Sequence, residues 1–517
     1  MTEGKQSLEA SLGAWLADLG STGAALDLLE AAEDLLADGS GNGASRELWH
    51  RYLNETRRPF FLRALPDRET RYRWAETTFS TILATDLNLE TLFQQRAREH
   101  PDRILFQEME GAETRTWSYQ RVLDRLRIMA ALFWSAHPES PRVAIVSENA
   151  LDSACCDLAC LTYDILVTPL SPHFNAETLA WIFDELSINT VVVETEELRD
   201  KLNHTRAEVK NPFQLYLLDP DSETPGPQEA RLGEAMAQLG KEQVDQVLEG
   251  RQRRGLTDLA TVMFTSGSTG RPKGVQYTLY NLISKRFARA AALPEVGEEE
   301  ILFSFLPLYH TFGRYLEMMG MLFWGGTYVF SGNPSFETLL RGLQEVRPTG
   351  LISIPRRWQQ IKDRSLSEMD ATDDRAGREE AFRRVVGDRL RWGLSAAGAL
   401  EPAAFHFFQR HGVALCSGFG MTEATGGITM TPPGEYEDDS VGIPLPGVEA
   451  RLSPEGELQI SGHYVARYLG DPVPAPGDGY WLPTGDIFKR RENGHYQIID
   501  RIKDIYKNSK GQTVAPG

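Results

Sequence analysis

Apolar residues recur at helical spacing near the start of the chain. They are Leu8, Leu12, Trp15, Leu16 and Leu19, followed by Leu28, Leu29, Ala32, Leu35 and Leu36. A repeat of three and four residues predicts amphipathic helices, and the glycine-rich stretch 39–43 interrupts it. We expect residues 1–78 to form a helical N-terminal extension. Two roles are open for this extension: a packing appendage, or a docking or dimerisation surface.

The pattern changes near residue 79. Residues 90–103 are typical of an amphipathic helix, and 103–109 with 115–119 predict a hairpin. Apolar runs at 143–148, 165–170 and 189–195 alternate with helical stretches, and a second such series runs from 259 to about 435. Runs without alternation are typical of strands buried on both faces of a mostly parallel sheet.

This pattern predicts an α/β fold with two doubly wound, mostly parallel sheets over residues 79–435. Short strands and turns then predict a β-rich subdomain over 436–500, and 501–517 follow it. Two polar segments interrupt the order. Residues 220–250 are interpreted as a surface excursion, and 364–380 as a solvated insertion.

Charge and targeting signals narrow the class of protein. The 517 residues include 54 Lys and Arg against 73 Asp and Glu, a net charge of −19. An acidic balance disfavours nucleic acid as a partner. The sequence shows neither an apolar run long enough for a transmembrane segment nor a secretory signal at its start. We therefore expect a cytoplasmic protein.

The four cysteines fit a reducing compartment. Cys155, Cys156 and Cys160 lie in one apolar helical stretch, and Cys416 lies far along the chain. A zinc site would need a fourth ligand at close spacing, which this stretch lacks. Free thiols in the core are the expected state.

The sharpest local signal is a loop that follows the apolar run 259–264. Its residues are Thr265, Ser266, Gly267, Ser268, Thr269, Gly270, Arg271, Pro272, Lys273 and Gly274. Glycines let backbone N–H groups turn inward, hydroxyls add donors, and Lys273 adds a positive charge. The spacing differs from that of the P-loop and of the dinucleotide fingerprint. The composition nevertheless indicates a site for phosphate groups.

This loop resembles the phosphate-loop signature of the adenylate-forming superfamily, which includes acyl-CoA synthetases, luciferases and peptide-synthetase adenylation domains. Further segments resemble that family's motifs in the same order, so that the resemblance covers about 85–515. They are 303–314, 390–400, 418–423, 480–486 and 500–504. The resemblance implies that a carboxylic acid and MgATP react to give an acyl-adenylate and pyrophosphate.

The resemblance also implies roles for individual residues around the reacting phosphates. Thr265–Gly270 and Lys273 would hold the β- and γ-phosphates, and Thr422 would bond the α-phosphate. Glu423 would hold Mg²⁺, a cation that prefers oxygen ligands. His310 would sit at the carboxylate end of the acyl site. Each residue also has an alternative without a functional role. Glu423 would then be a surface carboxylate, and His310 a core residue whose hydrogen bonds are made within the protein.

A second group of residues would bind the nucleoside. Phe419 would stack on adenine, Ile498 would pack on it, and Asp486 and Arg501 would bond the ribose. The alternative for Asp486 is a carboxylate in a turn that has no binding role. Lys503 would mark a hinge. The remaining residues implied at the adenine and substrate sites are Ala397, Gly398, Gly418, Gly420 and Met421.

The absence of an acidic residue from segment 303–314, which resembles the motif at the acyl site, indicates the branch of the family. An amino-acid-activating domain carries an aspartate there, whereas 303–314 contains no acid. The chain most resembles long-chain acyl-CoA synthetases, with carboxylic acid reductase adenylation domains as a close competitor, so a fatty or other apolar acid is expected. Met318, Met319, Met321, Phe323 and Trp324 could line an acyl tunnel or simply pack in the core. Ala396 and Ala397 stand where relatives more often have a glycine pair.

The family continues beyond the hinge into a mobile lid that supplies a catalytic lysine. The given sequence stops at Gly517, so the lid is expected to be absent. Such a chain would be cut before the lid, naturally split, or a nucleotide- or acyl-binding scaffold without catalysis. The thiol acceptor would be CoA or the phosphopantetheine of a carrier protein.

Overall fold

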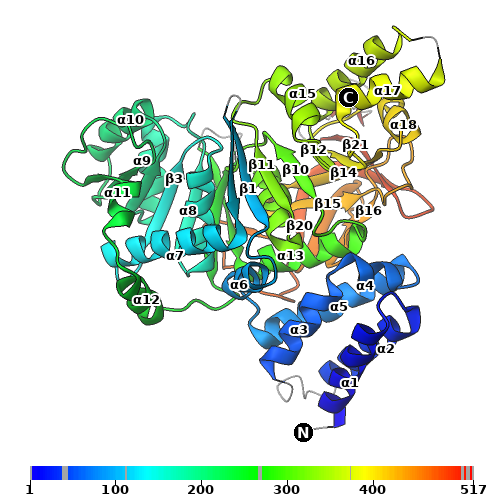
Figure 1. Ribbon diagram of the computed structural model, residues 1–517, viewed down its shortest axis with the longest axis horizontal. Helices are drawn as coiled ribbons and strands as arrows, with labels where there is room; N and C mark the ends of the chain where they lie inside the picture. Colours follow the sequence, from blue (N-terminus) through cyan, green and yellow to red (C-terminus); the bar gives the residue numbers. More distant parts are fainter. Residues whose placement is uncertain are drawn as a thin grey trace.

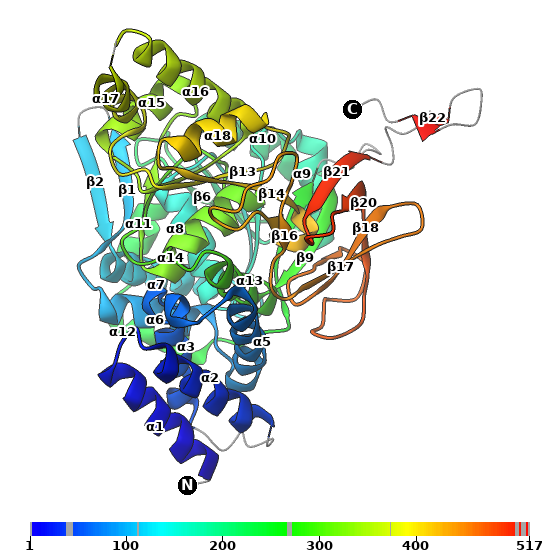
Figure 2. The ribbon, with the colours of Figure 1, turned by 90° about the vertical axis from the view of Figure 1, so that its right-hand side faces the viewer.

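The computed structural model describes residues 3–37, 45–110, 113–265, 271–372, 374–501, 506–507 and 513–514. Two large sheets lie side by side, the N-terminal helices form a lobe below them, and a small sheet lies toward the C-terminal end (Figures 1 and 2). The expected α/β class with two mostly parallel sheets and a small β-rich part is confirmed. The described part contains no helix long and apolar enough to cross a membrane.

The N-terminal lobe is helical, as the leucine spacing predicts. Trp15 meets Phe61 edge to face, with ring centres 5.2 Å apart. Trp74 meets Phe287 at 6.0 Å, which packs the lobe on the α/β part. The helices are α1 (Glu3–Ala17), α2 (Thr22–Ala37), α3 (Arg46–Thr56), α4 (Pro59–Ala64) and α5 (Arg68–Thr85). Because α5 continues across residue 78, the proposed end of the extension lies inside a helix.

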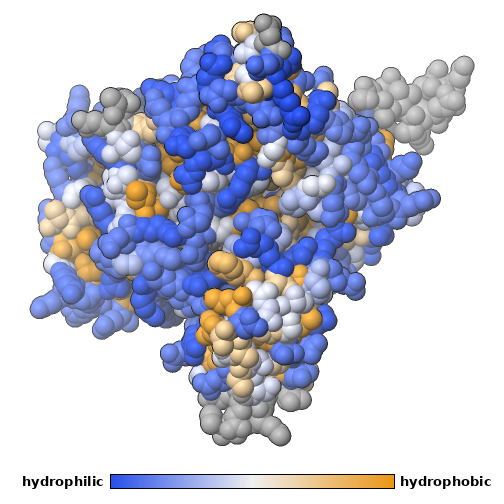
Figure 3. Space-filling view, turned by 45° about the vertical axis from the view of Figure 1, so that its right-hand side comes forward, coloured by the Kyte–Doolittle hydropathy of each residue, from blue (hydrophilic) through white to orange (hydrophobic). Residues whose placement is uncertain are grey.

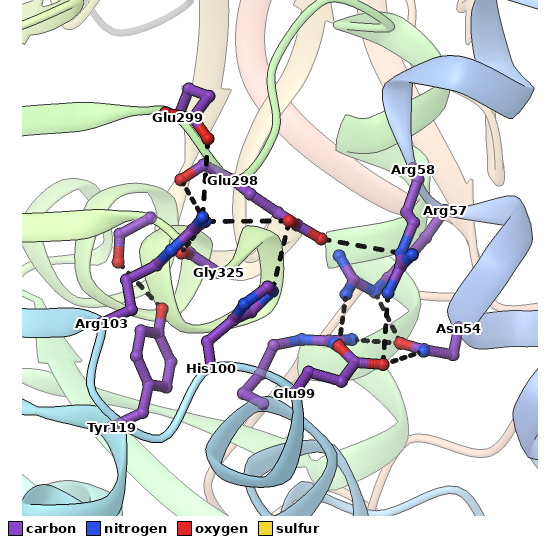
Figure 4. A network of polar contacts seen from close by, with 12 residues as sticks. Asn54, Arg57, Arg58, Glu99, His100, Arg103, Tyr119, Glu298, Glu299 and Gly325 are labelled. Atoms are coloured by element: carbon purple, nitrogen blue, oxygen red, sulfur yellow. Dashed lines mark hydrogen bonds and ion pairs between the residues drawn. The ribbon is translucent and has the colours of Figure 1, made fainter.

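A polar network joins this lobe to the sheets (Figure 4). Arg58 Nη2 lies 3.3 Å from Glu99 Oε1, and Arg58 Nε lies 3.6 Å from Glu298 Oε1. On the other side of Glu298, Oε2 lies 3.2 Å from His100 Nε2. These contacts link the start of α4, the end of α6 (Leu89–Glu99) and the loop before β10 (Ile301–Ser304), so the lobe is held by charge as well as by apolar packing.

The first large sheet has eight strands in the order β19-β9-β8-β4-β3-β5-β6-β7. Parallel pairs run from β8 through β7, while β9 and β19 are antiparallel to their neighbours. The strands are β3 (Arg142–Val146), β4 (Leu166–Leu170), β5 (Thr190–Val193), β6 (Gln214–Leu217), β7 (Glu229–Arg231), β8 (Leu259–Thr265), β9 (Lys273–Thr278) and β19 (Arg467–Tyr468). The helices in this part of the chain are α7 (Tyr119–Ala136), α8 (Leu151–Thr162), α9 (Ala176–Leu186), α10 (Glu196–Arg206), α11 (Leu232–Ala237) and α12 (Lys241–Gly250).

The second large sheet has nine strands in the order β16-β15-β14-β13-β12-β10-β11-β1-β2. The expected hairpin forms its edge. The strands are β1 (Ile104–Glu110), β2 (Glu113–Ser118), β10 (Ile301–Ser304), β11 (Thr327–Phe330), β12 (Gly350–Ser353), β13 (Trp392–Ser395), β14 (Ala414–Met421), β15 (Gly426–Met430) and β16 (Ile443–Pro444). The helices are α13 (Leu279–Ala292), the π-helix η2 (Phe312–Met318), α14 (Met319–Trp324), α15 (Phe336–Glu345), α16 (Pro355–Met369), α17 (Arg375–Val386), α18 (Pro402–Arg410) and the short η3 (Thr422–Ala424).

The small antiparallel sheet follows and has the order β17-β18-β20-β21. Its strands are β17 (Val448–Leu452), β18 (Glu457–Gly462), β20 (Leu482–Arg490) and β21 (Tyr496–Arg501). Beyond it, β22 (Tyr506–Lys507) pairs with β23 (Thr513–Val514). The division into 79–435, 436–500 and 501–517 stays a prediction, and β16 and β19 of the second segment join the large sheets.

Two expectations about polar segments are incomplete. Residues 220–250 are not only a surface excursion, because they supply the edge strand β7 and the helices α11 and α12. Val244 and Leu248, four residues apart, are buried, which anchors α12. Residues 364–369 end α16 and 375–380 begin α17; most of the described charged side chains of this segment are exposed, as expected, but they belong to helices.

The expectation of free core cysteines is confirmed. All four thiols are buried and unbridged. Three lie on α8, a helix that is buried on every side because it is enclosed by neighbouring elements. Burial raises the pKa of Cys416 to about 12, so this thiol stays protonated at neutral pH.

The face drawn in Figure 3 is mostly hydrophilic, and apolar areas appear on the N-terminal lobe. The exposed large apolar side chains of this lobe are Leu16, Leu19, Phe60 and Leu83. Leu16 and Leu19 belong to the helical repeat but lie outside the buried face of α1, which consists of Leu8, Leu12 and Trp15.

Candidate active site

A cavity of about 870 Å³ lies where the carboxyl ends of strands from both large sheets meet. Glu148 and Glu194 follow β3 and β5 of the first sheet. Phe305, Ser331 and Ala397 follow β10, β11 and β13 of the second. Ligands of open α/β sheets bind at the carboxyl ends of the strands, so the topology itself favours this cavity as the site.

The loop after β10 brings His310 to the cavity. Asn149 holds this loop: its Nδ2 donates to Leu306 O at 2.6 Å, and its Oδ1 accepts from Leu308 N at 2.8 Å. At Gly313 an added Cβ would lie 2.3 Å from Leu306 O, so only glycine allows the π-helix to approach the loop this closely. Asn149 was not anticipated from the sequence, because it lies more than 150 positions away from the loop it holds.

His310 lines the cavity with its side chain open to it. Desolvation by the surrounding protein lowers the pKa of His310. The imidazole is therefore neutral at neutral pH, when it can donate one hydrogen bond and accept another. This position differs from that of a satisfied core histidine.

The segment after Cys416 forms another part of the cavity wall. Gly420, Met421 and Thr422 line the cavity with Ala397, whose φ is +66°. Thr422 O accepts a hydrogen bond of 2.5 Å from Tyr277 Oη, which ties this segment to β9. Other predicted residues lie beside these: Gly398 near Pro355, and Gly418 and Phe419 on an adjoining smaller cavity.

Tyr468 connects the residues expected at the metal and at the phosphates. Glu423 is 8% exposed, so it is not a surface carboxylate, and its Oε1 accepts a 2.6 Å hydrogen bond from Tyr468 Oη. Lys273 Nζ lies 5.0 Å from the centre of the same ring. Tyr468 reaches both because β19 pairs with β9, in which Lys273 is the first residue. Sequence patterns carry no signal for this tyrosine.

The phosphate loop is described at its two ends. Thr265 ends β8, and its hydroxyl donates to Lys273 O at 3.4 Å. Ser266, Gly267, Ser268, Thr269 and Gly270 lie outside the described residues, as does Lys503. Lys273, at the described end of the loop, lies over the ring of Tyr468, whose hydroxyl donates to Glu423.

The residues expected at the nucleoside lie on and beside the small sheet. Asp486 and Arg501 are paired across β20 and β21, with Arg501 Nε 3.2 Å from Asp486 Oδ1. Ile498 is 41% exposed on β21. Phe419 meets Phe488 of β20 edge to face, with ring centres 4.9 Å apart. None of these four predicted residues lines the main cavity, and Phe419 lines the smaller adjoining one.

A bound Mg²⁺ fits these residues only together with a phosphate ligand. In the part of the chain that the structure describes, no group of three or more His, Cys, Asp or Glu side chains could hold a metal ion. Mg²⁺ is often held by one or two carboxylates, with waters and substrate phosphates as its other ligands. Glu423 fits that requirement, because Tyr468 links it to Lys273 at the described end of the phosphate loop.

The aromatic and methionine-rich segment packs in the core. Met318, Met321 and Trp324 are at most 1% exposed, and Phe323 meets Phe287 with ring centres 4.9 Å apart. None of the five residues expected for a tunnel lines the main cavity. The structure thus supports core packing for them.

We expect the pH dependence of nucleotide binding to follow Asp486. Burial raises the pKa of Asp486, and Arg501 offsets part of that rise. If the ionised carboxylate binds the ribose, ATP affinity falls on acidification at a higher pH than for an ordinary aspartate. Calorimetric titration of the protein with ATP at a series of pH values, from about 8 to about 4.5, measures this fall in affinity. Arg501→Gln should move the fall in ATP affinity to higher pH. A fall at the same pH in Asp486→Asn would contradict the assignment of Asp486 to the ribose.

We expect Gly420→Ala to reduce activity by about 10- to 100-fold, because backbone misplacement at a reacting site is costly. An added Cβ would lie 2.1 Å from Gly426 O, which would push β14 and the attached Thr422 away from β15. The assay is the acid-dependent exchange of pyrophosphate into ATP. Gly233→Ala is the matched control, since no atom lies within 4 Å of its added Cβ. Equal activity in both variants would show that the strand end tolerates displacement.

Comparison with known proteins matches residues 93–468 to the family described as AMP-binding enzyme. Among the relatives, long-chain-fatty-acid–CoA ligase 5 of Mus musculus is 25% identical over 77% of this chain, and ligase 6 of Homo sapiens is 27% identical over 77%. The matches span 66% and 64% of those relatives, so the chain covers slightly less than two thirds of their length.

Two solved structures show the same fold. The anthranilate CoA ligase AuaEII, in complex with anthranoyl-AMP, has a TM-score of 0.68 at 17% identity, covering 83% of this chain and 80% of that one. ATP-bound MatB from Rhodopseudomonas palustris has a TM-score of 0.67 at 23% identity, covering 83% and 82%. Since the family match extends over more than half of the sequence, the chain belongs to the AMP-binding enzyme family.

Proposed function

We propose that this protein activates a carboxylic acid with ATP, forming an acyl-adenylate and pyrophosphate, and that the acyl group then passes to a thiol. The observation that carries the proposal is the cavity where His310 and Thr422 face one space, with Glu423 directly after Thr422 in the chain. The names of the matched relatives support a ligase of fatty acids and CoA.

The chemistry requires that two anions meet. A carboxylate oxygen attacks the α-phosphorus of ATP, a new P–O bond forms, and the bond to pyrophosphate breaks. Lys273 and the N–H groups of the phosphate loop would offset charge on the β- and γ-phosphates, and Thr422 would donate its hydroxyl to the α-phosphate. Mg²⁺ would neutralise phosphate charge when it is bound by Glu423.

The remaining residues would bind and orient the reactants. Neutral His310 would donate one hydrogen bond to the acid at the entrance of the acyl site. Phe419 and Ile498 would contact adenine, while Asp486 and Arg501 would bind the ribose. Ala397, Gly398, Gly418, Gly420 and Met421 supply close backbone walls, and Lys503 would act as the hinge. We place the protein in the cytoplasm, with CoA or a carrier-protein phosphopantetheine as the acceptor.

The test is acid-dependent exchange of labelled pyrophosphate into ATP with a panel of fatty and aryl acids. It is made on this chain and on any longer form that its gene encodes. Exchange with one class of acid supports the proposal and names the substrate class. ATP binding by calorimetry without exchange in any form would overturn it and leave a nucleotide-binding scaffold.

The acceptor needs a separate assay once an acid is found. Release of AMP on addition of CoA identifies a CoA ligase. Release only with a phosphopantetheine-loaded carrier protein, or with a reductase domain, would instead identify a carrier-dependent enzyme or an adenylation domain of a carboxylic acid reductase.

A further inference from the structure

Helix α13 carries three buried cations. Lys285, Arg286 and Arg289 are 0%, 3% and 3% exposed. Burial is the main cause that lowers each pKa, and in the described part of the chain none of the interactions that act on these groups comes from a carboxylate. An unpaired buried cation is unfavourable, so an anion that reached one of these groups would be stabilised by it.

The three cations differ in their surroundings. Lys285 Nζ lies 3.7 Å from the centre of the Tyr464 ring and donates to Gly427 O. Arg289 Nη1 has only the sulfur of Met430, at 3.4 Å, and Arg289 Nε has no hydrogen-bond partner. Arg289 is therefore a donor that lacks an acceptor.

Arg289 faces a side branch of the main cavity. The branch is the smaller cavity already noted at Phe419, and it shares Thr311, Phe312 and Gly420 with the main cavity. Its walls are otherwise mostly apolar, with Leu316 and Leu394 among them. The open space is about 10 Å³, close to that of one water molecule. A small polar group suits this space better than a long alkyl chain.

The charge of Arg289 persists in this apolar branch. Burial lowers the pKa of Arg289 to about 10, which leaves the guanidinium protonated at neutral pH. A carboxylate that reached the branch would accept the unused Nε–H and balance the charge. Such charge-assisted hydrogen bonds are about twice as strong as neutral ones.

We propose that Arg289 forms an anion subsite at the far end of the acyl site, and that the preferred substrate is an acid with a second carboxylate. This inference rests on the proposed function and narrows its substrate class. One carboxylate reacts near His310 and Thr422, while the other pairs with Arg289 in the side branch.

The experiment compares matched acids in the pyrophosphate exchange assay. Straight-chain monocarboxylic and dicarboxylic acids of equal carbon number, from about three to about ten carbons, are tested for kcat/KM with the intact chain. We expect a dicarboxylic acid to exceed its monocarboxylic match by about 10-fold or more, as a hydrogen bond to a charged group implies.

Variants locate the effect. Arg289→Met should remove the preference for the dicarboxylic acid over its monocarboxylic match, and Arg289→Lys should retain part of it. Arg286→Met is the matched control, because it deletes a buried cation of the same helix that does not line the branch. Thermal unfolding of all variants confirms that they fold.

The outcomes separate the two proposals. Exchange that favours monocarboxylic acids would overturn the anion subsite and leave the ligase function standing. An equal loss of the dicarboxylic preference in Arg289→Met and Arg286→Met would also overturn it, because the preference would then depend on the overall positive charge and not on contact with Arg289. If no acid supports exchange, the proposed function fails, and calorimetry with dicarboxylic against monocarboxylic acids on native protein and Arg289→Met still decides the subsite.

Discussion

Asp157→Asn is expected to reduce the free energy of unfolding by about 3–5 kcal/mol. Asp157 is 2% exposed on α8, and its two carboxylate oxygens accept hydrogen bonds from Arg314 of the π-helix at 2.5 and 2.8 Å. Arg314 Nη1 is also bonded, at 2.9 Å each, to Thr261 Oγ1 and Tyr315 Oη. Asparagine keeps the shape but leaves a fully buried guanidinium without its counter-charge.

Thermal unfolding measures the effect. Dividing the lost free energy of unfolding by the usual entropy of unfolding per residue, summed over the chain, gives a fall in the unfolding midpoint of about 3–5 °C if the chain unfolds in one transition. The double variant Asp157→Leu with Arg314→Met is the control, since removing both charges of a buried pair is often nearly neutral. A single variant as stable as the native chain would show that the pair contributes little. His310 precedes the π-helix by two residues, so loosening this pair should also disturb the cavity.

Glu423→Gln is expected to lower pyrophosphate exchange by about 100- to 1,000-fold, the scale of losing a preorganised charge at the reacting centre. Glutamine can still accept the hydrogen bond from Tyr468, so the fold around the site is kept while the charge is removed. The measurement is kcat for exchange as a function of Mg²⁺ concentration. The variant should need more Mg²⁺ for half-maximal rate.

Two further variants separate charge from position. Tyr468→Phe removes the hydrogen bond that orients Glu423 but keeps the ring beneath Lys273, so we expect a smaller loss, about 10-fold. Glu455→Gln, an exposed carboxylate at a turn of the small sheet, should have no effect. Unchanged activity and Mg²⁺ dependence in Glu423→Gln would contradict its assignment to the metal.

Local patterns predicted much of the secondary structure. Leu8, Leu12 and Trp15 specify a buried helix face because helical spacing is a property of neighbouring residues. Apolar runs such as 165–170 specify buried strands for the same reason. Between residues 220 and 250 the prediction was incomplete, because apolar positions such as Val244 and Leu248 are scattered among charged residues and their burial depends on contact with distant elements.

The sequence by itself determined the family, the class of fold and the identity of the candidate site residues, because these depend on the order and spacing of residues along the chain. The tertiary structure decided which of them meet. Sheet order brings Tyr468 to Glu423 and Lys273, β20–β21 pairing joins Asp486 to Arg501, and helix packing buries Arg289 beside the cavity. These contacts join residues far apart in the chain, and spacing along the sequence carries no information about them until strand order fixes which elements are neighbours.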